Sequence, residues 1–296
     1  MTTRSRAELA LFATTFIWAS TFVVVKAGSG NISPSLFIAL RFGIGALIFG
    51  MLLFKQLQTI RFQTLKSGLL LGSILGVGII LQNYGIYQTT ASKSAFITGL
   101  MVIFTPIAQL ILERRPPKVG NIIGIFIVTY GLYLLTSPSD SEMNFGDILV
   151  LISAVIFGVY IVYLDMYSRN ENVLHLAFVQ VTVTTIIASV VALFEGIVFV
   201  PTNQLLLSLL YMGICATVFT TYIQTRYQKD TTPTRAVIIF TIEPVIAAVL
   251  AFIFLNEVLG ISGILGASLI VLGILISEFS DLMVSKFYHK VQPIDE

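Results

Sequence analysis

The chain contains about ten runs of mostly apolar residues, separated by short polar segments. A helix of about 20 apolar residues spans the hydrocarbon core of a bilayer, which is about 30 Å thick. Because 56% of the residues are hydrophobic and only 11% are charged, a water-soluble fold could not bury the apolar surface. The sequence therefore predicts an all-α integral membrane protein with ten transmembrane helices. We expect these helices at 8–26, 34–54, 66–87, 94–112, 119–136, 147–166, 173–194, 204–225, 234–255 and 260–278.

The positively charged residues indicate how the helices are oriented. Loops retained in the cytoplasm are enriched in Lys and Arg, and 14 of the 17 such residues fall in segments that would lie on one side of the membrane. The opposite side has only Lys26 and Lys93, and Arg41 falls within the second span. We therefore expect a multi-pass protein of the cell membrane, with both termini and the tail 280–296 in the cytoplasm.

Other classes of protein fit the sequence poorly. The first apolar run follows Arg4 and Arg6, but it is too long for a secretory signal and lacks a convincing cleavage site. Cys215 is the only cysteine and cannot form an intrachain disulfide. The chain has no H-E-x-x-H, G-x-S-x-G or P-loop motif, and its net charge of +2 does not indicate a nucleic-acid surface. We expect no catalytic activity, no cofactor, no metal and no nucleic-acid partner.

A weak internal repeat is visible in the sequence. At an offset of 138 residues, Glu243-Pro244 aligns with Thr105-Pro106, which predicts prolines at equivalent places in the fourth and ninth spans. Further along the chain, pairs of glycines align at an offset of 142. This change of offset indicates a deletion of about one helical turn from the first half.

The repeat divides the chain into two five-helix halves, 8–137 and 146–279, joined by a polar linker at 138–145. Five crossings is an odd number, so the second half must enter the membrane from the opposite side to the first. Inverted repeats of this kind place a ligand site near the midplane, where it opens alternately to the two sides. The sequence therefore predicts alternating access between two helical bundles.

A set of short motifs, in a fixed order, also resembles a known family. The chain is similar to the drug/metabolite transporter superfamily, and specifically to its EamA-type members with ten helices in two repeats. This resemblance implies transport of a small solute, commonly export. It further implies that the first, third, fourth, sixth, eighth and ninth helices surround a central cavity, with the fifth and tenth at the periphery. The motifs are Trp18-Ala19-Ser20 followed by Lys26, Leu40-Arg41-Phe42, Glu243-Pro244 followed by Asn256-Glu257, and Gly266 with Gly273.

Glu243 is the charge that most needs an explanation, because it lies in the middle of the ninth span. A charge at the centre of a bilayer costs about 2.5 to 3.5 kcal/mol on insertion scales, so it usually faces a protein-lined or watery route. Pro244 lacks an amide hydrogen and crowds the carbonyl of Phe240, which predicts a bend beside the carboxylate. In the fourth span, Pro106 should likewise crowd the carbonyl of Val102 and bend the helix. The carboxylate could couple transport to protons, bind a solute amine, or tie two helices together.

Other polar and aromatic residues are candidates for the wall of a solute cavity. Indole, amide and phenol groups need hydrogen-bond partners away from water, so they tend to face protein and not lipid. On this basis we expect Trp18, Gln82, Asn83, Tyr84 and Tyr160 to contact the solute together with the acid of the ninth span.

Arg41 lies about 10 Å deep in the second span and cannot lose its proton, so it must find acceptors. It could hold an anionic group of the solute, but we favour an anchor to neighbouring carbonyls. The sequence as a whole predicts a secondary transporter driven by a gradient, an exporter or facilitator of small polar or amphipathic metabolites. Amino acids are the leading candidates, since Glu243 could take the ammonium and Arg41 the carboxylate. The alternatives are an intramembrane enzyme acting on a lipid-soluble substrate, or a channel.

Overall fold

The computed structural model describes residues 2–135, 144–256 and 260–291. Within these ranges the chain is helical, and an isolated bridge between Ile32 and Phe199 is its nearest approach to a β-strand. The predicted all-α class is therefore confirmed. The predicted linker 138–145 lies mostly outside the described residues, as do Glu257 and residues 292–296 of the tail.

The helices account for all ten predicted spans. By length and composition, eight helical segments of the described chain are able to cross a membrane, and α6 and α13 supply two shorter apolar segments. The order along the chain is α1 (Thr3–Gly28), α2 (Pro34–Leu53), α3 (Phe62–Gln88), α4 (Ala91–Gly99), α5 (Met101–Glu113), α6 (Val119–Leu135), α7 (Phe145–Ser168), α8 (Val173–Glu195), α9 (Asn203–Gly213), α10 (Thr220–Tyr227), α11 (Pro233–Phe240), α12 (Glu243–Leu255) and α13 (Ile261–Val291).

Polar side chains mark where several helices begin. The side-chain oxygens of Thr2, Thr90, Asn144, Thr202 and Thr232 each accept a hydrogen bond from a backbone N–H in the first turn of the following helix. Such caps satisfy donors that have no partner within the helix. They explain why the apolar segments start where short polar sequences end.

Three of the spans are not continuous α-helices. The fourth span is interrupted at Leu100, between α4 and α5, and the ninth at Thr241 and Ile242, between α11 and α12. The eighth span contains a π-helical turn, Ile214–Phe219, between α9 and α10. Irregular backbone at membrane depth is tolerated where it is buried in protein or lines a cavity. These three interruptions therefore point to the interior of the bundle.

The fourth and ninth spans are built on the same plan. Thr90 caps α4 by accepting from the N–H of Lys93, and Thr232 caps α11 by accepting from the N–H of Arg235. Both α5 and α12 contain 13 residues, and both are followed by a cap residue with a left-handed φ of 56°, namely Arg114 and Asn256. All these features correspond at an offset of 142 residues.

This common offset corrects the predicted alignment of the two prolines. Met101, and not Thr105, is the first residue of α5 and takes the place of Glu243 at the start of α12. Pro106 lies inside α5, whereas Pro244 occupies the first turn of α12. The two prolines are not equivalent because the caps and the interruption set the register. A proline in the first turn costs little, since its missing N–H would have no helical partner there.

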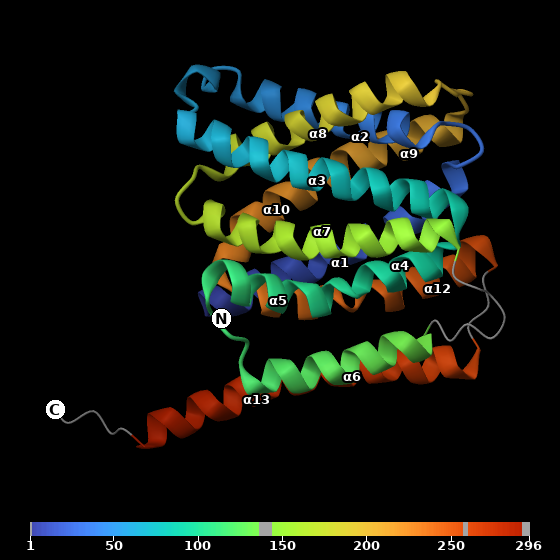
Figure 1. The fold of residues 1–296 in the computed structure, drawn as a ribbon. Coiled ribbons are helices and arrows are strands. Elements are labelled where there is room, and N and C mark those ends of the chain that lie inside the picture. The colour runs from blue at the N-terminus through green and yellow to red at the C-terminus, as the bar shows by residue number, and fades with distance from the viewer. Residues whose placement is uncertain (1, 136–143, 257–259, 292–296) are drawn as a thin grey trace.

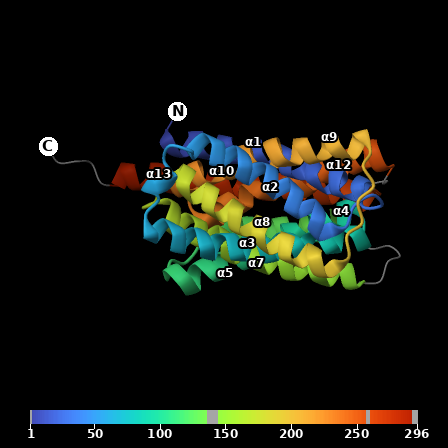
Figure 2. The same ribbon diagram turned by 90° about the horizontal axis from the view of Figure 1, so that it is seen from above.

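The helices run side by side along one common direction (Figure 1). α6 and α13 pack against each other at one edge of the molecule, and Figure 2 shows the remaining helices gathered in a bundle. Within the bundle α3 packs against α7 and α8, α2 against α8, and α1 against α12. At some of these contacts the backbones of the two helices approach each other closely. A Cβ added at Gly72 would lie 2.6 Å from the carbonyl oxygen of Gln180, and one at Gly131 would lie 2.8 Å from that of Gly266.

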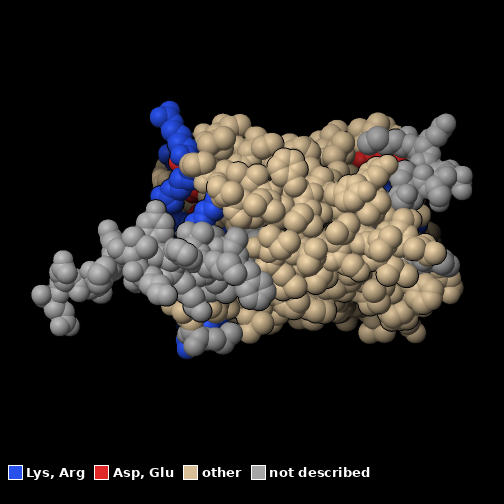
Figure 3. Space-filling model, turned by 90° about the horizontal axis from the view of Figure 1, so that it is seen from below, with Lys and Arg blue, Asp and Glu red and all other residues tan. Residues whose placement is uncertain are grey.

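Most of the positive charge lies at one end of this bundle. Because successive spans alternate in direction, the N-terminus, the α2–α3, α5–α6, α7–α8 and α10–α11 connections and the far end of α13 all reach the same end (Figure 1). In Figure 3 the Lys and Arg side chains gather mostly at that end, and the broad middle of the visible face is free of charge. This pattern fits a bundle with an apolar belt and one basic end.

Candidate functional site

A cavity of about 100 Å³ lies inside the bundle. Residues of α1, α2, α3, α4, α5, α7, α10, α11, α12 and the π-helical turn line it, whereas no described residue of α6 or α13 does. The spans named by the family resemblance thus surround a central cavity, with the second span added through Arg41 and Phe42. The interruptions of the fourth and ninth spans lie beside this cavity, since Met101 and Glu243 are both part of its wall.

Glu243 places a carboxylate halfway through the ninth span. It follows Pro233 by ten residues and precedes Leu255 by twelve, which correspond to about 15 and 18 Å of helix. Its side chain is 7% exposed, and among the described residues it has no hydrogen-bond or ion-pair partner. A buried charge without a partner is costly. The side chain is therefore available to a proton or to a cationic group that enters the cavity.

Aromatic rings make up much of the wall around this acid. Trp18 and Phe240 contact each other edge to face, with ring centroids 5.2 Å apart. Phe22, Phe157 and Tyr160 add further rings to the same cavity. Aromatic faces attract ammonium groups and also bind apolar surface. The cavity thus combines one acid with rings suited to an amphipathic cation.

Polar side chains in the wall are held by partners. The amide of Gln82 donates to the hydroxyl of Thr98 at 3.0 Å, and both residues line the cavity. The hydroxyl of Tyr160 donates to the Oε1 of Gln180 at 2.9 Å, and the Nε2 of Gln180 donates to Thr225 at 3.2 Å. The first bond joins α3 to α4. The other two join α7 to α8 and α8 to α10. They give the cavity wall a defined shape.

Arg41 is anchored to the π-helical turn of the eighth span. Its Nη2 donates to the carbonyl oxygen of Ala216 at 2.7 Å, and its Nε donates to the hydroxyl of Thr217 at 2.9 Å. The hydroxyl of Thr217 in turn donates to the carbonyl oxygen of Met212 at 2.9 Å. A π-helical turn leaves backbone acceptors without regular partners. Arg41 and the hydroxyl of Thr220, at 3.0 Å, both donate to the carbonyl oxygen of Ala216, and the Arg41 side chain still lines the cavity.

The structure brings most of the predicted site residues together, but not all of them. Trp18, Gln82, Tyr160, Glu243 and Arg41 all line the same cavity. The other two predicted contacts, both on α3, lie elsewhere.

Asn83 and Tyr84 do not line the cavity. The amide of Asn83 donates to the carbonyl oxygen of Pro34 at 3.0 Å, and the hydroxyl of Tyr84 accepts from Ser35 at 3.3 Å. The physical reason is helical geometry, since consecutive residues point about 100° apart and only Gln82 faces inward. We therefore exclude Asn83 and Tyr84 from the candidate site, and assign them to the contact between α3 and the start of α2.

Sequence reasoning missed the apolar part of the wall. Phe22, Phe157, Phe240 and Met101 line the cavity, yet in a membrane protein such residues resemble lipid-facing ones. Helical spacing would have found two of them. Phe22 follows Trp18 by four residues and Phe157 precedes Tyr160 by three, so each lies on the same helix face as a predicted site residue. Phe240 ends α11 before the interruption, so helical spacing does not relate it to Glu243.

The two interrupted spans meet next to the cavity. A Cβ added at Gly99, the last residue of α4, would lie 3.1 Å from the Cγ of Pro244 and 3.2 Å from a methyl group of Leu132. α4 and α12 therefore pack closely at the point where the two spans are broken. The absence of a side chain at Gly99 allows this contact.

The chain is similar to known transporter sequences along almost all of its length. It matches the EamA-like transporter family over residues 5–137 and 144–279. A relative from Archaeoglobus fulgidus, named as an uncharacterized transporter, is 31% identical over 273 residues, covering 92% of this chain and 86% of the relative. The uncharacterized transporter YoaV of Bacillus subtilis is 26% identical over 281 residues, covering 92% of this chain and 96% of the relative.

A solved crystal structure shares the fold. It aligns with a TM-score of 0.77 over 95% of this chain and 99% of that chain, at 16% sequence identity. At that identity the likeness concerns the fold alone. The ten apolar helical segments, the central cavity and the family match over residues 5–137 and 144–279 together assign a class. The chain is a multi-pass membrane transporter and belongs to the EamA-like transporter family.

Proposed function

We propose that this protein is a gradient-driven secondary transporter of small amphipathic solutes that carry a protonated amine, amino acids and simple amines among them. The observation that carries the proposal is the unpartnered carboxylate of Glu243, halfway through the membrane in a cavity walled by aromatic rings. An ammonium group would neutralise the acid, and the rings would bind the apolar part of the solute. No nucleotide site is found in the sequence, so the energy comes from a gradient, and the protein works as an exporter or facilitator.

The proposed mechanism is alternating access between two inverted halves, 8–137 and 146–279. Inverted repeats in transporters place the binding site near the midplane, often at interrupted helices. The common plan of the fourth and ninth spans and the depth of Glu243 support this arrangement. The basic end of the molecule, which includes the N-terminus, supports a cytoplasmic location for both termini in the cell membrane. Tags placed on the two termini and tested for access in intact cells would check this orientation.

A transport assay with matched solutes tests the substrate class. Purified protein in vesicles is offered phenylalanine, phenethylamine and 3-phenylpropionate, which share a phenyl group and differ in amine and carboxylate. We expect uptake of the first two and none of the third. The comparison of the first two also tests Arg41: if phenylalanine is carried at least ten-fold faster than phenethylamine, Arg41 binds the solute carboxylate as well as anchoring the π-helical turn.

The role of the acid is tested with Glu243→Gln, and Glu171→Gln provides the matched control. Glu171 lies at the basic end and accepts from the hydroxyl of Thr64, which a glutamine can also do. We expect Glu243→Gln to lose amine transport and Glu171→Gln to keep it. Equal transport by both variants would refute the proposed site.

An imposed pH gradient across vesicles that hold the natural protein separates proton coupling from facilitated passage. If Glu243 exchanges a proton for the solute, an imposed pH gradient drives accumulation in the natural protein. If it only binds the amine, phenylalanine equilibrates and the pH gradient has no effect on its final level. We propose the first case, because the acid has no fixed cation to hold it ionised.

A further inference from the structure

A second pocket, of about 440 Å³, lies at the basic end of the molecule. It is formed by the first turns of α1, α6 and α11, by the C-terminal parts of α5 and α7, and by the α5–α6 and α10–α11 connections. Among the described residues of its wall, Asp230 is the one that is acidic. The basic residues in the wall are Arg4, Arg115, Lys118, Arg169, Lys229 and Arg235.

Three of these basic side chains pair with carboxylates of the described residues. Glu8 pairs with Arg235 at 2.9 Å and with Arg4 at 2.8 Å, and Asp165 pairs with Arg169 at 2.9 Å.

Two basic residues of the pocket keep their hydrogen-bonding capacity. Arg115 and Lys229 have no hydrogen bond or ion pair within the described part of the chain, and Arg115 is exposed. They come from different halves of the chain, one from the α5–α6 connection and one from the α10–α11 connection. An anion in the pocket would therefore be contacted from both halves.

The basic pocket is separate from the solute cavity. Along α11, Pro233 and Thr234 line the basic pocket, whereas Phe240 lines the cavity. Between them Ala236, Val237 and Ile238 belong to a fully packed apolar cluster.

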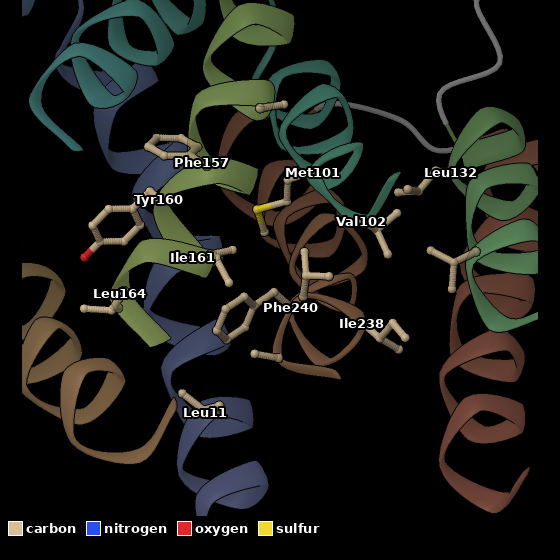
Figure 4. Packing of buried hydrophobic residues seen from close by; sticks show 14 of the residues in the cluster. Leu11, Met101, Val102, Leu132, Phe157, Tyr160, Ile161, Leu164, Ile238 and Phe240 are labelled. Atoms are coloured by element: carbon tan, nitrogen blue, oxygen red, sulfur yellow. The ribbon is translucent and has the colours of Figure 1, made fainter. Parts of the chain in front are cut away.

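Figure 4 shows this cluster, with Leu11, Ile161 and Phe240 pointing toward one another between α1, α7 and α11.

The distance along α1 from Arg4 to Trp18 is 14 residues, or about 21 Å. The basic pocket thus lies at the level where the spans end, near the lipid headgroups. It is not a continuation of the cavity in this conformation.

The rim of the pocket continues into the lipid-facing surface. Lys118 and Asn121 line the pocket, and their neighbours Val119 and Ile122 are 74% and 38% exposed. Phe126, one turn further along α6, is 72% exposed. An acyl chain could follow this apolar face while its headgroup occupies the pocket. A soluble anion would make no use of this surface.

We propose that the basic pocket binds the phosphate of an anionic phospholipid, with its acyl chains against α6. Basic pockets between helices on the cytoplasmic side bind lipid headgroups, and guanidinium groups form paired hydrogen bonds with phosphate. Because Arg115 and Lys229 come from different halves, the lipid joins the halves at this end and stabilises the conformation described here. The proposal does not depend on the identity of the transported solute.

Lipid binding to two double variants tests the proposal. Arg115→Gln with Lys229→Gln removes two charges from the pocket. Lys55→Gln with Arg61→Gln removes two exposed charges from the α2–α3 connection at the same end, outside the pocket. Full-length protein in detergent is titrated with phosphatidylglycerol or phosphatidylcholine, and bound lipid is counted by native mass spectrometry.

We expect phosphatidylglycerol to bind the pocket variant at least ten-fold more weakly than the natural protein, and the control variant within two-fold. Phosphatidylcholine should bind poorly to all three proteins. The melting temperature without lipid should be the same for both variants, so that lost binding is not lost folding. Equal loss in the two variants would mean that general attraction to the basic end, and not this pocket, holds the lipid.

A competition arm distinguishes the lipid from a soluble anion. Inorganic phosphate and glycerophosphoglycerol, the headgroup without acyl chains, are each added at millimolar concentration to protein loaded with phosphatidylglycerol. We expect neither to displace the lipid. Displacement of the lipid by either compound at millimolar concentration would overturn the lipid proposal and identify the pocket as a site for soluble phosphate compounds.

Discussion

The fourth and ninth spans share one backbone plan but carry different chemistry where they break. Each has a threonine cap, a short first helix, an interruption and a 13-residue second helix with a left-handed cap. At the start of the second helix the fourth span has Met101-Val102 and the ninth has Glu243-Pro244. Because both spans are interrupted, the interruption is a property of the common fold. The acid is present in one half only. The cavity between the two similar halves thus has a carboxylate from the second half and none at the equivalent place of the first.

Removing the acid should have the largest effect. Glu243→Met gives the ninth span the residue that the fourth span has at the equivalent place. The unpartnered carboxylate disappears and the aromatic wall remains, so we expect amine transport to fall at least 100-fold while folding is kept. Initial uptake rates in vesicles measure the loss, and gel filtration checks the folding. Transport within ten-fold of the natural protein would show that the asymmetry has no functional role.

Moving the acid to the other half should have the next largest effect. Met101 lines the same cavity as Glu243. Met101→Glu added to Glu243→Met moves the carboxylate to the equivalent place in the other half, on the wall of the same cavity. We expect uptake to recover about ten-fold relative to the single variant. Met101→Gln in the same background is the control, because it adds an amide of similar size without the charge. Recovery in this control would mean that polarity alone suffices.

The sequence predicted the spans well because their causes are local. Apolar runs and capping residues such as Thr90 and Thr232 determine where each helix begins, and both signals are visible in the printed sequence. The register of the fourth span against the ninth was predicted wrongly, because the alignment relied on the two prolines, whereas the offset of 142 predicted for the later glycines agrees with the starts of α6 and α13. The better marker was also local: each threonine cap is followed three residues later by a basic residue, Lys93 or Arg235.

The inward face of each helix was harder to predict than its ends. A transmembrane helix is apolar on all sides, so periodicity does not separate a residue facing the cavity from one facing lipid. Gln82, Asn83 and Tyr84 are all polar or aromatic and adjacent, and only the structure shows that one of them faces the cavity. Phe157 and Phe240 gave no polar signal at all. Their role depends on packing between helices that are distant in sequence.

The contact between the two broken spans provides a third prediction. Gly99→Ala adds a methyl group 3.1 Å from Pro244 and 3.2 Å from Leu132, so a neighbour must shift. Overpacking of this kind costs about 1 to 3 kcal/mol. We expect a lower melting temperature in detergent and slower transport.

The matched control is Gly30→Ala, because no atom lies within 4 Å of the added methyl group there. The control should change stability by less than about 0.5 kcal/mol. Equal destabilisation of the two variants would show that loss of glycine itself, and not the contact between α4 and α12, is responsible.

Replacing the proline should have the smallest effect. Pro244 is in the first turn of α12, and the fourth span is interrupted at the equivalent place with valine there. The interruption therefore does not require proline, and we expect Pro244→Ala to retain it. The melting temperature should shift by no more than Gly99→Ala shifts it, and amine transport should stay within ten-fold of the natural rate. Loss of transport as large as that of Glu243→Met would mean that the ninth span, unlike the fourth, needs its proline to keep the carboxylate facing the cavity.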